Sequence, residues 1–394
     1  MSRPRFEIAR VKLRHYRSIK ACDVSLGPLT LLVGPNGAGK SNFLDALRLT
    51  AQSLTENLDN ALRERGGAGE VRRRSRGHPT HFGIDVRFSS NGTSGRYAFQ
   101  VAAERGGDFR ISHEECRVSS SEFGEMDHYF VVRNGALIEH TEPVMPPVPE
   151  DRLLLVTAAG IPAFRPVFDG LSSSNVYNLN PDAMRHLQKP ESSDLLRRDG
   201  SNIASVLERL RREQPDVKAR IEEYLSRVVE GVVGVDRKGL GAWETVEFRQ
   251  RVAGDKAPWT FQATSMSDGT LRALGVLASL FAGSETVDSP VGIEEPEAAL
   301  HPAAAGLLLD VLRDASATRQ VLVTTHSPDL LDSPTITEDE LLAVKARDGV
   351  TEIGRVDRAG QLALRESLYT PGELLRVNQL APSGTSDEQM ELFA

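Results

Sequence analysis

The sequence has 394 residues, 40% of them hydrophobic, which is enough for one large or two ordinary domains with a real core. Its 55 acidic and 47 basic residues give a formal net charge of -8, so the whole molecule is not a general binder of polyanions, although local basic patches are compatible with this balance. The two cysteines, Cys22 and Cys116, have no CxxC pattern or His-rich neighbours, so neither a disulfide framework nor a zinc site is predicted.

No apolar signal region opens the chain, and its longest apolar run, Leu153 to Ile161, is too short to cross a membrane. We therefore predict a cytoplasmic protein without a membrane partner.

The first part of the chain has the pattern of a sheet followed by a helix. Residues 6 to 33 alternate as in strands and close with the apolar run Leu29 to Val33, and a helical pattern starts at Lys40 after a glycine-rich turn. Short strands separated by Gly, Ser and Asn turns favour an antiparallel sheet after that helix. These strands are predicted at 82–88, 97–103, 109–118 and 129–138, and a further apolar strand at 153–157.

The second part alternates between helical and strand-like patterns. Residues 199 to 230 have helical periodicity with mixed charges on the other face, but the segment is much too short for a long coiled-coil arm. Strand and helix alternate from 243 to 325, and Asp348-Gly349 predicts a hairpin turn. We expect a first half of the main domain at 1–165, a helical insertion at 166–240, a second half at 241–380 and a flexible tail at 381–394.

The strongest motif is a P-loop placed after an apolar strand and at the start of a helix. Its glycines let backbone N–H groups face phosphate oxygens, Lys40 supplies a charge for the β- and γ-phosphates, and Ser41 can ligate Mg²⁺. A chance glycine-rich turn is the alternative, and a bare match arises in roughly one chain in a hundred of this length. The residues predicted to bind the nucleotide are Gly34, Pro35, Asn36, Gly37, Ala38, Gly39, Lys40, Ser41 and Asn42.

Two adjacent carboxylates, Glu294 and Glu295, follow a short apolar segment. Alternation at a strand end points successive side chains in different directions, so one acid can serve Mg²⁺ while the next addresses an attacking water. We assign Glu294 to the metal and Glu295 to general base or water positioning. Taken alone, such an acidic run is more often a solvated loop.

Two further motifs stand near these acids in the sequence. Ser267-Asp268-Gly269-Thr270 opens a helical pattern in which Ser267 is a good N-cap, and a helix N-terminus presents N–H groups to an anion. The alternative is an ordinary capped helix. His326 ends the apolar run Val321 to Thr325, where a lone histidine is usually structural but can also sense a γ-phosphate.

The order of these motifs resembles the ATPase heads of the ABC superfamily, in the SMC/RecF/OLD-like branch of AAA-type ATPases. The opening Leu13 to Ile19, followed by Gly34-Pro35-Asn36-Gly37, is similar to the start of such heads. The resemblance implies an α/β P-loop NTPase fold of the ABC type, with a mixed central sheet, an antiparallel β subdomain and a helical insertion. It also implies ATP and Mg²⁺ as cofactors, with Glu295 and His326 as the catalytic residues.

The same resemblance implies an ATP-dependent homodimer with two sandwiched nucleotides. Ser267, Asp268, Gly269 and Thr270 would then act in trans, with Ala298 to His301 at the dimer contact. The chain departs from the family where Glu294 replaces the aspartate usual in transporters, and no Q-loop glutamine can be placed. After His326 we find no DxD-type cluster of the kind a Toprim nuclease needs, so no built-in nuclease is expected.

An arginine-rich segment follows the P-loop helix. Arg72, Arg73, Arg74 and Arg76 suggest contacts with a DNA backbone. A solvated loop, or one held by nearby acids, is slightly favoured over DNA contact because no aromatic residues interleave for stacking.

The end of the chain carries a second hint about partners. Gln389, Met390, Leu392 and Phe393 resemble the peptide by which bacterial DNA polymerases and repair factors dock on the sliding clamp. A tail folded onto its own head or onto a dimer partner is the alternative.

The motifs together predict a Mg-dependent ATPase that acts as a dimerisation switch in DNA repair, replication-linked genome maintenance or anti-phage defence. A regulatory ATPase that controls a separately encoded protein effector, without binding DNA, is the alternative. A scaffold that binds ATP but never hydrolyses it is disfavoured by Glu295 and His326.

Overall fold

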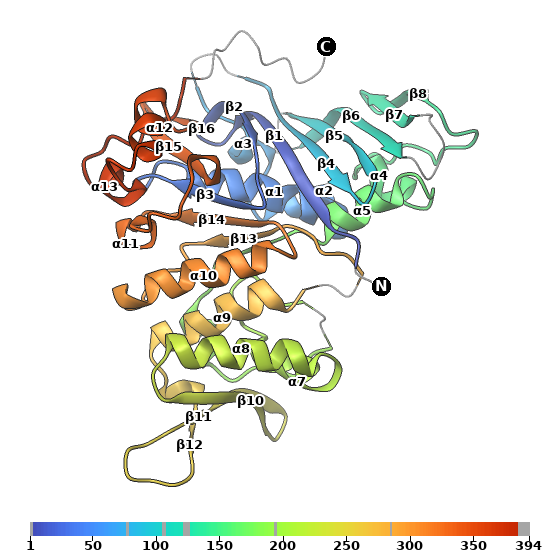
Figure 1. The fold of residues 1–394 in the computed structure, drawn as a ribbon. Coiled ribbons are helices and arrows are strands. Elements are labelled where there is room, and N and C mark those ends of the chain that lie inside the picture. Colours follow the sequence, from blue (N-terminus) through green and yellow to red (C-terminus); the bar gives the residue numbers. More distant parts are fainter. Residues whose placement is uncertain are drawn as a thin grey trace.

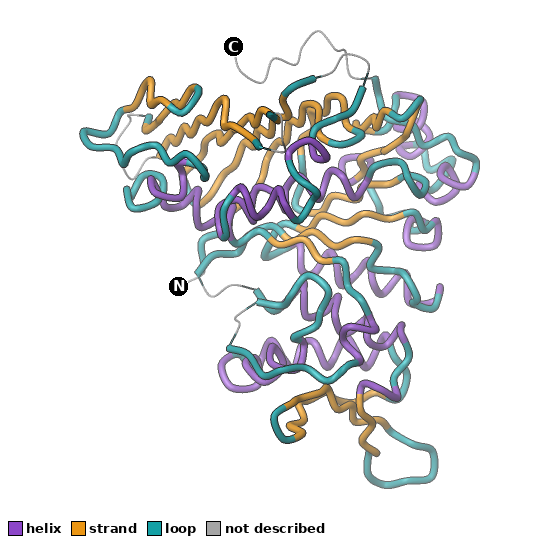
Figure 2. Tube along the Cα trace, turned by 180° about the vertical axis from the view of Figure 1, so that it is seen from behind, coloured by secondary structure: helices purple, strands orange, loops and turns teal. Residues whose placement is uncertain are grey.

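The protein is described by a computed structural model that covers residues 3–75, 79–104, 108–120, 127–192, 195–283 and 286–384. A large twisted sheet with helices beneath it forms the upper part of the molecule, and a smaller lobe of helices and a short sheet extends below (Figure 1). Seen from behind, the sheet runs across the whole upper part, and the lower lobe ends in the short sheet (Figure 2). Within the described residues no helix has both the length and the apolar character to cross a bilayer.

The large sheet has thirteen strands in the order β8-β7-β6-β5-β4-β1-β2-β16-β15-β3-β14-β13-β9. The antiparallel part contains β1 (Phe6–Tyr16), β2 (Ile19–Ser25), β4 (His81–Ser90), β5 (Thr93–Ala103), β6 (Phe109–Ser120), β7 (His128–Arg133) and β8 (Ala136–His140). The central part contains β3 (Leu29–Val33), β9 (Asn175–Tyr177), β13 (Val291–Glu294), β14 (Val321–Thr325), β15 (Leu341–Arg347) and β16 (Val350–Arg355). Strands β3, β14, β13 and β9 are mutually parallel. The predicted α/β class, with a mixed central sheet and an antiparallel subdomain, is confirmed.

Strands β3 and β14 are buried along their whole length because helices cover both faces of the sheet. On β3, Leu29, Leu31 and Val33 belong to one hydrophobic cluster, whereas Leu32 belongs to the other. Helix α1 (Lys40–Thr55) packs in the cluster that contains Leu32, and α10 (Ala305–Ser316) packs in the cluster that contains Leu29, Leu31 and Val33. This two-sided burial fixes the strand ends at which the motifs lie.

Several short helices accompany the large sheet. They are α2 (Leu58–Arg63), α3 (Ala68–Val71), α4 (Leu154–Ala158), α5 (Arg165–Ser172), α6 (Pro181–Arg185), α11 (Pro328–Leu331), α12 (Arg358–Arg365) and α13 (Pro371–Arg376). The lower lobe holds α7 (Ile203–Glu213), α8 (Pro215–Val228), α9 (Asp268–Phe281), β10 (Val232–Leu240), β11 (Trp243–Gln250) and β12 (Trp259–Gln262). Of the predicted insertion at 166–240, α7, α8 and β10 lie in this lobe, whereas β9 joins the large sheet.

The turn predicted at Asp348-Gly349 is present, since Arg347 pairs with Val350 across the β15–β16 hairpin. Both turn residues have positive φ, 48° and 74°, as a two-residue hairpin requires. The strand predicted at 129–138 is split by a similar turn at Asn134-Gly135 into β7 and β8.

The strand predicted at 153–157 is wrong, because this segment forms helix α4. Its first N–H groups are bonded by a carboxylate from β6: Glu114 Oε2 accepts from Leu154 N at 2.6 Å and Oε1 accepts from Leu155 N at 2.9 Å. The hydroxyl of Tyr97 donates to Oε1 at 3.0 Å. A distant carboxylate therefore caps the helix start, which overrides the local strand preference.

Glu114 makes the stability of the protein depend on pH. It is fully buried, and burial raises its pKa to about 7 from the ordinary 4.5. Because the folded pKa is the higher one, the contribution of Glu114 is present below pH 4.5 and is lost as pH rises to 7, by up to ~3 kcal/mol. Urea unfolding of wild type and Glu114→Gln between pH 4.5 and 7 should show the wild-type free energy of unfolding falling relative to the variant.

An exposed carboxyl serves as the control. Glu139→Gln on β8 should unfold with the pH dependence of the wild type, since Glu139 lies at the sheet surface. Parallel pH curves for wild type and Glu114→Gln would contradict the raised pKa.

Candidate functional site

The P-loop leaves the carboxyl end of β3 and runs into α1. Gly37 and Gly39 have φ of 75° and 102°, a region that favours glycine. A Cβ on Gly34 would lie 2.1 Å from the carbonyl oxygen of Val344, so only glycine lets the loop pass this strand. The exposed tip, Pro35 to Gly37, leaves the loop open to a phosphate group.

Lys40 is turned back onto its own loop. Its Nζ donates to the carbonyl oxygens of Gly34 at 2.8 Å and Pro35 at 3.1 Å. Burial lowers the pKa of Lys40, and the negative charges of Glu295 and Glu297 act in the opposite direction. The predicted P-loop lysine therefore lies in the electrostatic field of the acidic motif, although the two are far apart in sequence.

Parallel pairing of β13 and β14 brings Glu295 and His326 together. Glu294 is in register with Thr324, so the residue after each strand lies beside the other. Glu295 Oε1 lies 3.0 Å from Nδ1 of His326. The backbone of Glu295 has φ of 46°, a strained conformation for a side-chain-bearing residue, and its N–H donates to Thr324 O at 2.9 Å. This conformation turns the carboxylate toward the histidine.

Glu294, the predicted metal ligand, ends β13. Its Oε1 accepts a hydrogen bond from Nη2 of Arg198 at 2.8 Å, so a guanidinium holds this carboxylate. Ser41, the other predicted metal ligand, lies in the first turn of α1 with an exposed side chain.

A third acid, Glu297, was not assigned from the sequence. Its Oε1 accepts from Oγ1 of Thr325 at 2.6 Å, and its Oε2 is buried without a hydrogen-bond partner among the described residues. Burial raises the pKa of Glu297. The acidic Glu-Glu-Pro-Glu run was the available signal, but alternation alone does not show that the acid two residues after Glu295 turns inward.

These groups fit a magnesium–nucleotide complex. The described residues contain no group of three or more His, Cys, Asp or Glu side chains that would hold a metal alone. Mg²⁺ commonly binds through one or two carboxylates plus substrate phosphates, and the site offers Glu294, the unpartnered Glu297 oxygen and the Ser41 hydroxyl beside an open phosphate loop. The residues present are therefore of the kind that such a complex requires.

The start of α9 carries the predicted serine-glycine motif. Ser267 is its N-cap, and its Oγ accepts from Thr270 N at 3.2 Å. Asp268 is exposed and forms an ion pair with Arg185 of α6. The helix start is thus built as predicted, although its action in trans stays a prediction.

Helix α9 is also tied to the acidic loop of the same chain. A Cβ on Gly269 would lie 2.5 Å from the carbonyl oxygen of Ala299. Nη2 of Arg272 donates to the carbonyl oxygens of Glu294 at 3.1 Å and Glu295 at 2.9 Å. A movement of α9 would therefore shift the backbone that positions Glu295.

Residues from both ends of the chain support the P-loop, and the sequence did not reveal them. Oγ1 of Thr351 on β16 donates to Ala38 O at 2.8 Å. Ser18 Oγ lies 2.7 Å from Thr351 Oγ1 and accepts from Nδ2 of Asn42 at 2.6 Å. Three side chains thus hold the loop and the first turn of α1 in one hydrogen-bonded chain.

The predicted DNA contact by Arg72 and Arg73 is not supported. Arg73 is buried and donates to the carbonyl oxygens of Ser18 and Gly349, and Arg72 donates to that of Pro79. Arg74 is exposed but forms an ion pair with Glu70. The alternative, a segment held by its surroundings, describes these three arginines better.

Other predicted residues fall outside the described part of the chain. These are Arg76 and the predicted clamp-binding residues Gln389, Met390, Leu392 and Phe393. The missing Q-loop position has a structural candidate: Asn178 follows β9, which is parallel to β13 and in register with it. Its side chain is exposed at the edge where Glu294 lies.

Comparisons with known proteins agree with this geometry. The family described as "AAA domain, putative AbiEii toxin, Type IV TA system" matches residues 150–332, and one described as "AAA domain" matches residues 10–131. A solved Smc head domain with an extended coiled coil, bound to the C-terminal domain of ScpA and derived from Pyrococcus furiosus, superposes with TM-score 0.54 over 92% of this chain and 99% of that one, at 12% identity. A second Smc head, bound to the C-winged helix domain of ScpA, gives TM-score 0.52 at 13% identity over 90% and 99% of the two chains. The chain thus has the fold of these Smc heads, and its sequence is similar to AAA-domain families over residues 10–131 and 150–332.

Curated relatives match this head over short stretches. The OLD nuclease of Thermus scotoductus is 45% identical over 51 residues, which are 13% of this chain and 10% of that protein. The DNA replication and repair protein RecF of Magnetococcus marinus is 38% identical over 84 residues, 19% of this chain and 22% of that protein. The matched stretches thus span less than a quarter of the length of these relatives.

Thr351 gives a test of the P-loop support. Thr351→Val keeps the shape of the side chain but leaves Ala38 O without its donor, so we expect a loss of about 1–3 kcal/mol in the free energy of unfolding. The loosened loop should also bind ATP several-fold more weakly. Calorimetric titration with ATP and thermal unfolding measure the two effects.

Thr351→Ser is the matched control, because it retains the hydroxyl and should restore ATP binding. Wild-type affinity in Thr351→Val would show that the hydroxyl does not support the loop.

Proposed function

We propose that this head binds ATP with Mg²⁺, hydrolyses it, and uses the cycle to switch between a closed homodimer and separate heads. The observation that carries the proposal is the contact between Glu295 and His326 beside the P-loop. A carboxylate held by a strained backbone and a histidine, in the field of Lys40, is suited to activating a water next to bound phosphate.

Each residue has a distinct role in this proposal. Lys40 exchanges the two loop carbonyls that it now contacts for phosphate oxygens. Glu294 and Ser41 hold the metal, which supplies positive charge against the phosphate oxygens when bound. Glu295 orients the attacking water and accepts its proton, and His326 fixes the orientation of Glu295.

The dimer would join the start of α9 in one subunit to the nucleotide of the other. Ser267 and Gly269 lie at an exposed helix start that is suited to an anionic ligand. Gly269 packs on Ala299, and Arg272 holds the backbone of Glu295, so a contact at the helix start has a short path to that subunit's own acid. This supports a switch in which dimer contact and hydrolysis are coupled.

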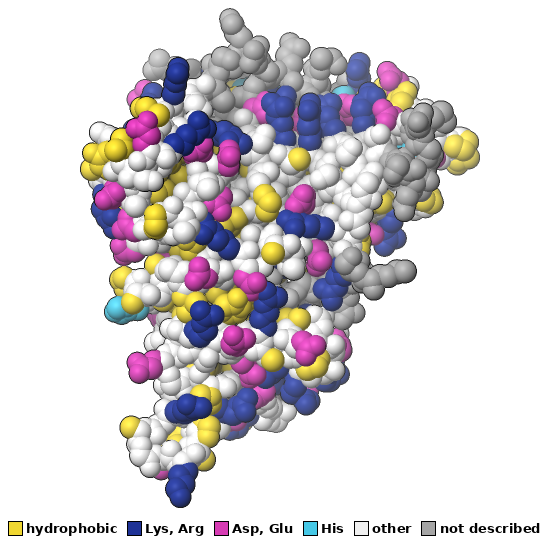
Figure 3. Space-filling model, in the orientation of Figure 1, with side chains coloured by type: hydrophobic (Ala, Val, Ile, Leu, Met, Phe, Trp, Pro, Cys, Tyr) yellow, Lys and Arg dark blue, Asp and Glu magenta, His cyan; other side chains and the backbone are white. Residues whose placement is uncertain are grey.

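We further propose that DNA binds the outer face of the antiparallel sheet. Cross-strand pairs place four arginines in one row across β1, β4, β5 and β6: Arg10, Arg87, Arg96 and Arg117. Lys and Arg side chains gather near the top of the molecule over this sheet (Figure 3). Alternate residues such as Val86 and Cys116 are buried, so the arginines lie on the solvent face.

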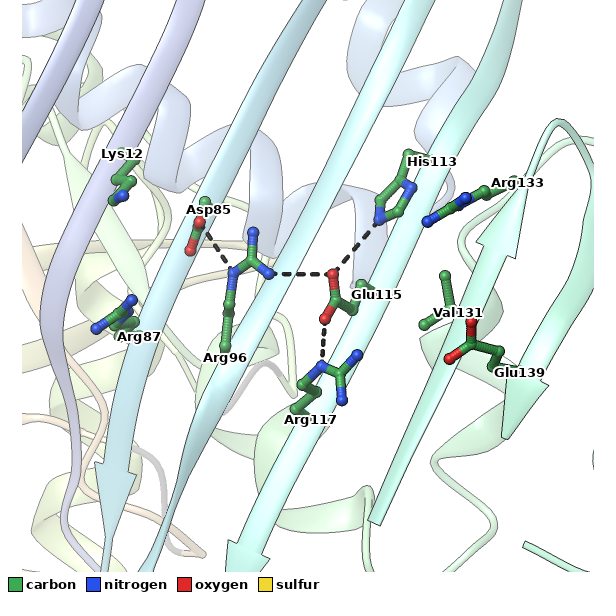
Figure 4. Close-up of a pocket in the computed structure, with 10 residues that line it drawn as sticks. All are labelled: Lys12, Asp85, Arg87, Arg96, His113, Glu115, Arg117, Val131, Arg133 and Glu139. Carbon is green, nitrogen blue, oxygen red and sulfur yellow. Dashed lines mark hydrogen bonds and ion pairs between the residues drawn. The ribbon is translucent and has the colours of Figure 1, made fainter. Parts of the chain in front are cut away.

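Part of the row lines a hollow of about 360 Å³ that also contains Lys12 and Arg133 (Figure 4). Arg96 is held between Asp85 and Glu115, with N–O distances of 3.0 Å to each. The side chains of Arg87 and Arg133 have no hydrogen bond or ion pair to any described residue, which leaves their guanidinium groups available for phosphate oxygens. Neighbouring strands lie about 4.8 Å apart, so a row of this kind can follow a phosphate backbone without reading its bases.

The first experiment compares ATP turnover and mass for wild type, Lys40→Ala and Glu295→Gln. Both variants should lose turnover, Glu295→Gln by about 10²–10³-fold because the general base is removed. Glu295→Gln should also accumulate as an ATP-dependent dimer in light scattering. Glu139→Gln is the control for an unrelated carboxyl and should behave as wild type.

Turnover that survives Glu295→Gln would overturn the catalytic assignment. A head that remains monomeric with ATP in every variant would remove the dimer switch.

The second experiment measures binding to duplex DNA as a function of salt. Arg87→Ala combined with Arg133→Ala should weaken binding and reduce the slope of log affinity against log salt by about 2, since each phosphate contact contributes about 1. Arg74→Ala, in the arginine-rich segment for which the sequence suggested DNA contact, is the matched control and should change little.

The reverse outcome, with loss in Arg74→Ala alone, would place DNA on the loop instead of the sheet. A head whose turnover and dimerisation ignore DNA would favour the alternative of a separately encoded protein effector. The clamp hypothesis is tested by adding the sliding clamp to the same assays.

A further inference from the structure

One ion pair in the site joins the predicted metal acid to the segment that precedes α7. Nη2 of Arg198 donates to Glu294 Oε1 at 2.8 Å. The Arg198 side chain is 44% exposed, whereas that of Glu294 is 12% exposed. The guanidinium therefore covers a nearly buried carboxylate while one side of it remains in water.

The backbone that presents Arg198 is firmly held. Asn178 N donates to Arg198 O at 3.0 Å, and Asn180 N donates to Asp199 O at 3.0 Å. The buried Asn202 accepts from Arg197 N at 2.7 Å. The backbone of Arg198 is thus fixed beside the end of β9. Only its long, half-exposed side chain is free to change partner.

The three acids of the motif have different partners. Glu295 contacts His326 and Glu297 accepts from Thr325, neither of which carries a permanent charge. Arg272 contacts only the backbone oxygen of Glu294, not its carboxylate. Among the described residues, Arg198 is thus the permanent cation bonded to the Glu294 carboxylate.

We infer that Arg198 and a divalent cation compete for the Glu294 carboxylate, an inference that rests on the proposed metal role of Glu294. A guanidinium 2.8 Å from Oε1 and a Mg²⁺ ion on the same carboxylate repel each other, so the ion enters only when the side chain of Arg198 swings away. The ion pair neutralises the charge of the Glu294 carboxylate. Arg198 thereby raises the concentration of Mg²⁺ that is needed for the ion to bind Glu294.

Arg198→Ala should affect the binding of Mg²⁺ but not the binding of ATP alone. Arg198→Ala should leave ATP affinity in EDTA unchanged, because no described contact links Arg198 to the P-loop. It should lower the Mg²⁺ concentration for half-maximal tightening of ATP binding by roughly two- to fivefold, the effect of removing one partly exposed ion pair. A fluorescent ATP analogue followed by anisotropy during a Mg²⁺ titration measures both quantities on the full chain, without using hydrolysis.

Two variants complete the experiment. Arg197→Ala is the matched control, since Arg197 is the adjacent arginine but pairs with Glu191 and should titrate as wild type. Arg198→Lys keeps the positive charge and should stay close to the wild-type midpoint. Thermal unfolding of each variant checks that the fold is retained.

The outcomes distinguish this inference from the proposed function. A wild type that binds no ATP, with or without Mg²⁺, would remove the proposed function. ATP binding that tightens with Mg²⁺ at the same midpoint in wild type, Arg198→Ala and Arg197→Ala would overturn the competition alone. A higher Mg²⁺ midpoint in Arg198→Ala would also overturn it, because Arg198 would then assist the metal.

Discussion

The parallel pairing of β13 with β14 is the constraint on which the site depends. It sets Glu294 opposite Thr324, and Glu295 and His326, which follow the ends of the two strands, then meet at 3.0 Å. β3 lies on the other side of β14 and delivers the P-loop to the same edge. Since parallel strands end at the same edge, one sheet register places the phosphate loop, the acids and the histidine together. The burial of these strands on both faces prevents a slip that would separate them.

Three basic side chains act on the acidic motif Glu294 to Glu297, through an ion pair, a backbone contact or a nearby positive charge. Arg198 holds the carboxylate of Glu294, Arg272 holds its carbonyl, and Lys40 lies in the field of Glu295 and Glu297. These arginines come from segments before α7 and at the start of α9. The lower lobe is therefore connected to the acids through side chains, and a change of lobe position must alter how the acids are held. This connection is the physical basis of the proposed switch.

The sequence predicted the elements that local patterns determine and missed those that depend on distant partners. The P-loop, the capped start of α9 and the strand that ends before His326 were all found, because glycine spacing, an N-cap and apolar runs are local signals. The segment 153–157 was predicted as a strand because its cap, Glu114, is supplied by β6. Thr351 escaped notice for the same reason: it reaches Ala38 across most of the chain.

The arginines show why a cluster of positive charges in the sequence need not form a basic patch on the folded surface. Arg72 and Arg73 are consecutive in the sequence, but their guanidinium groups donate hydrogen bonds to backbone carbonyl oxygens. Arg87 and Arg96 are isolated in the sequence, but the register of β4 and β5 places them side by side. Cross-strand pairing thus brings together arginines that are far apart in the sequence. The arginines that are adjacent in the sequence instead hold a loop in place. A basic surface on a sheet is a property of register, and only the folded arrangement of β1, β4, β5 and β6 creates it.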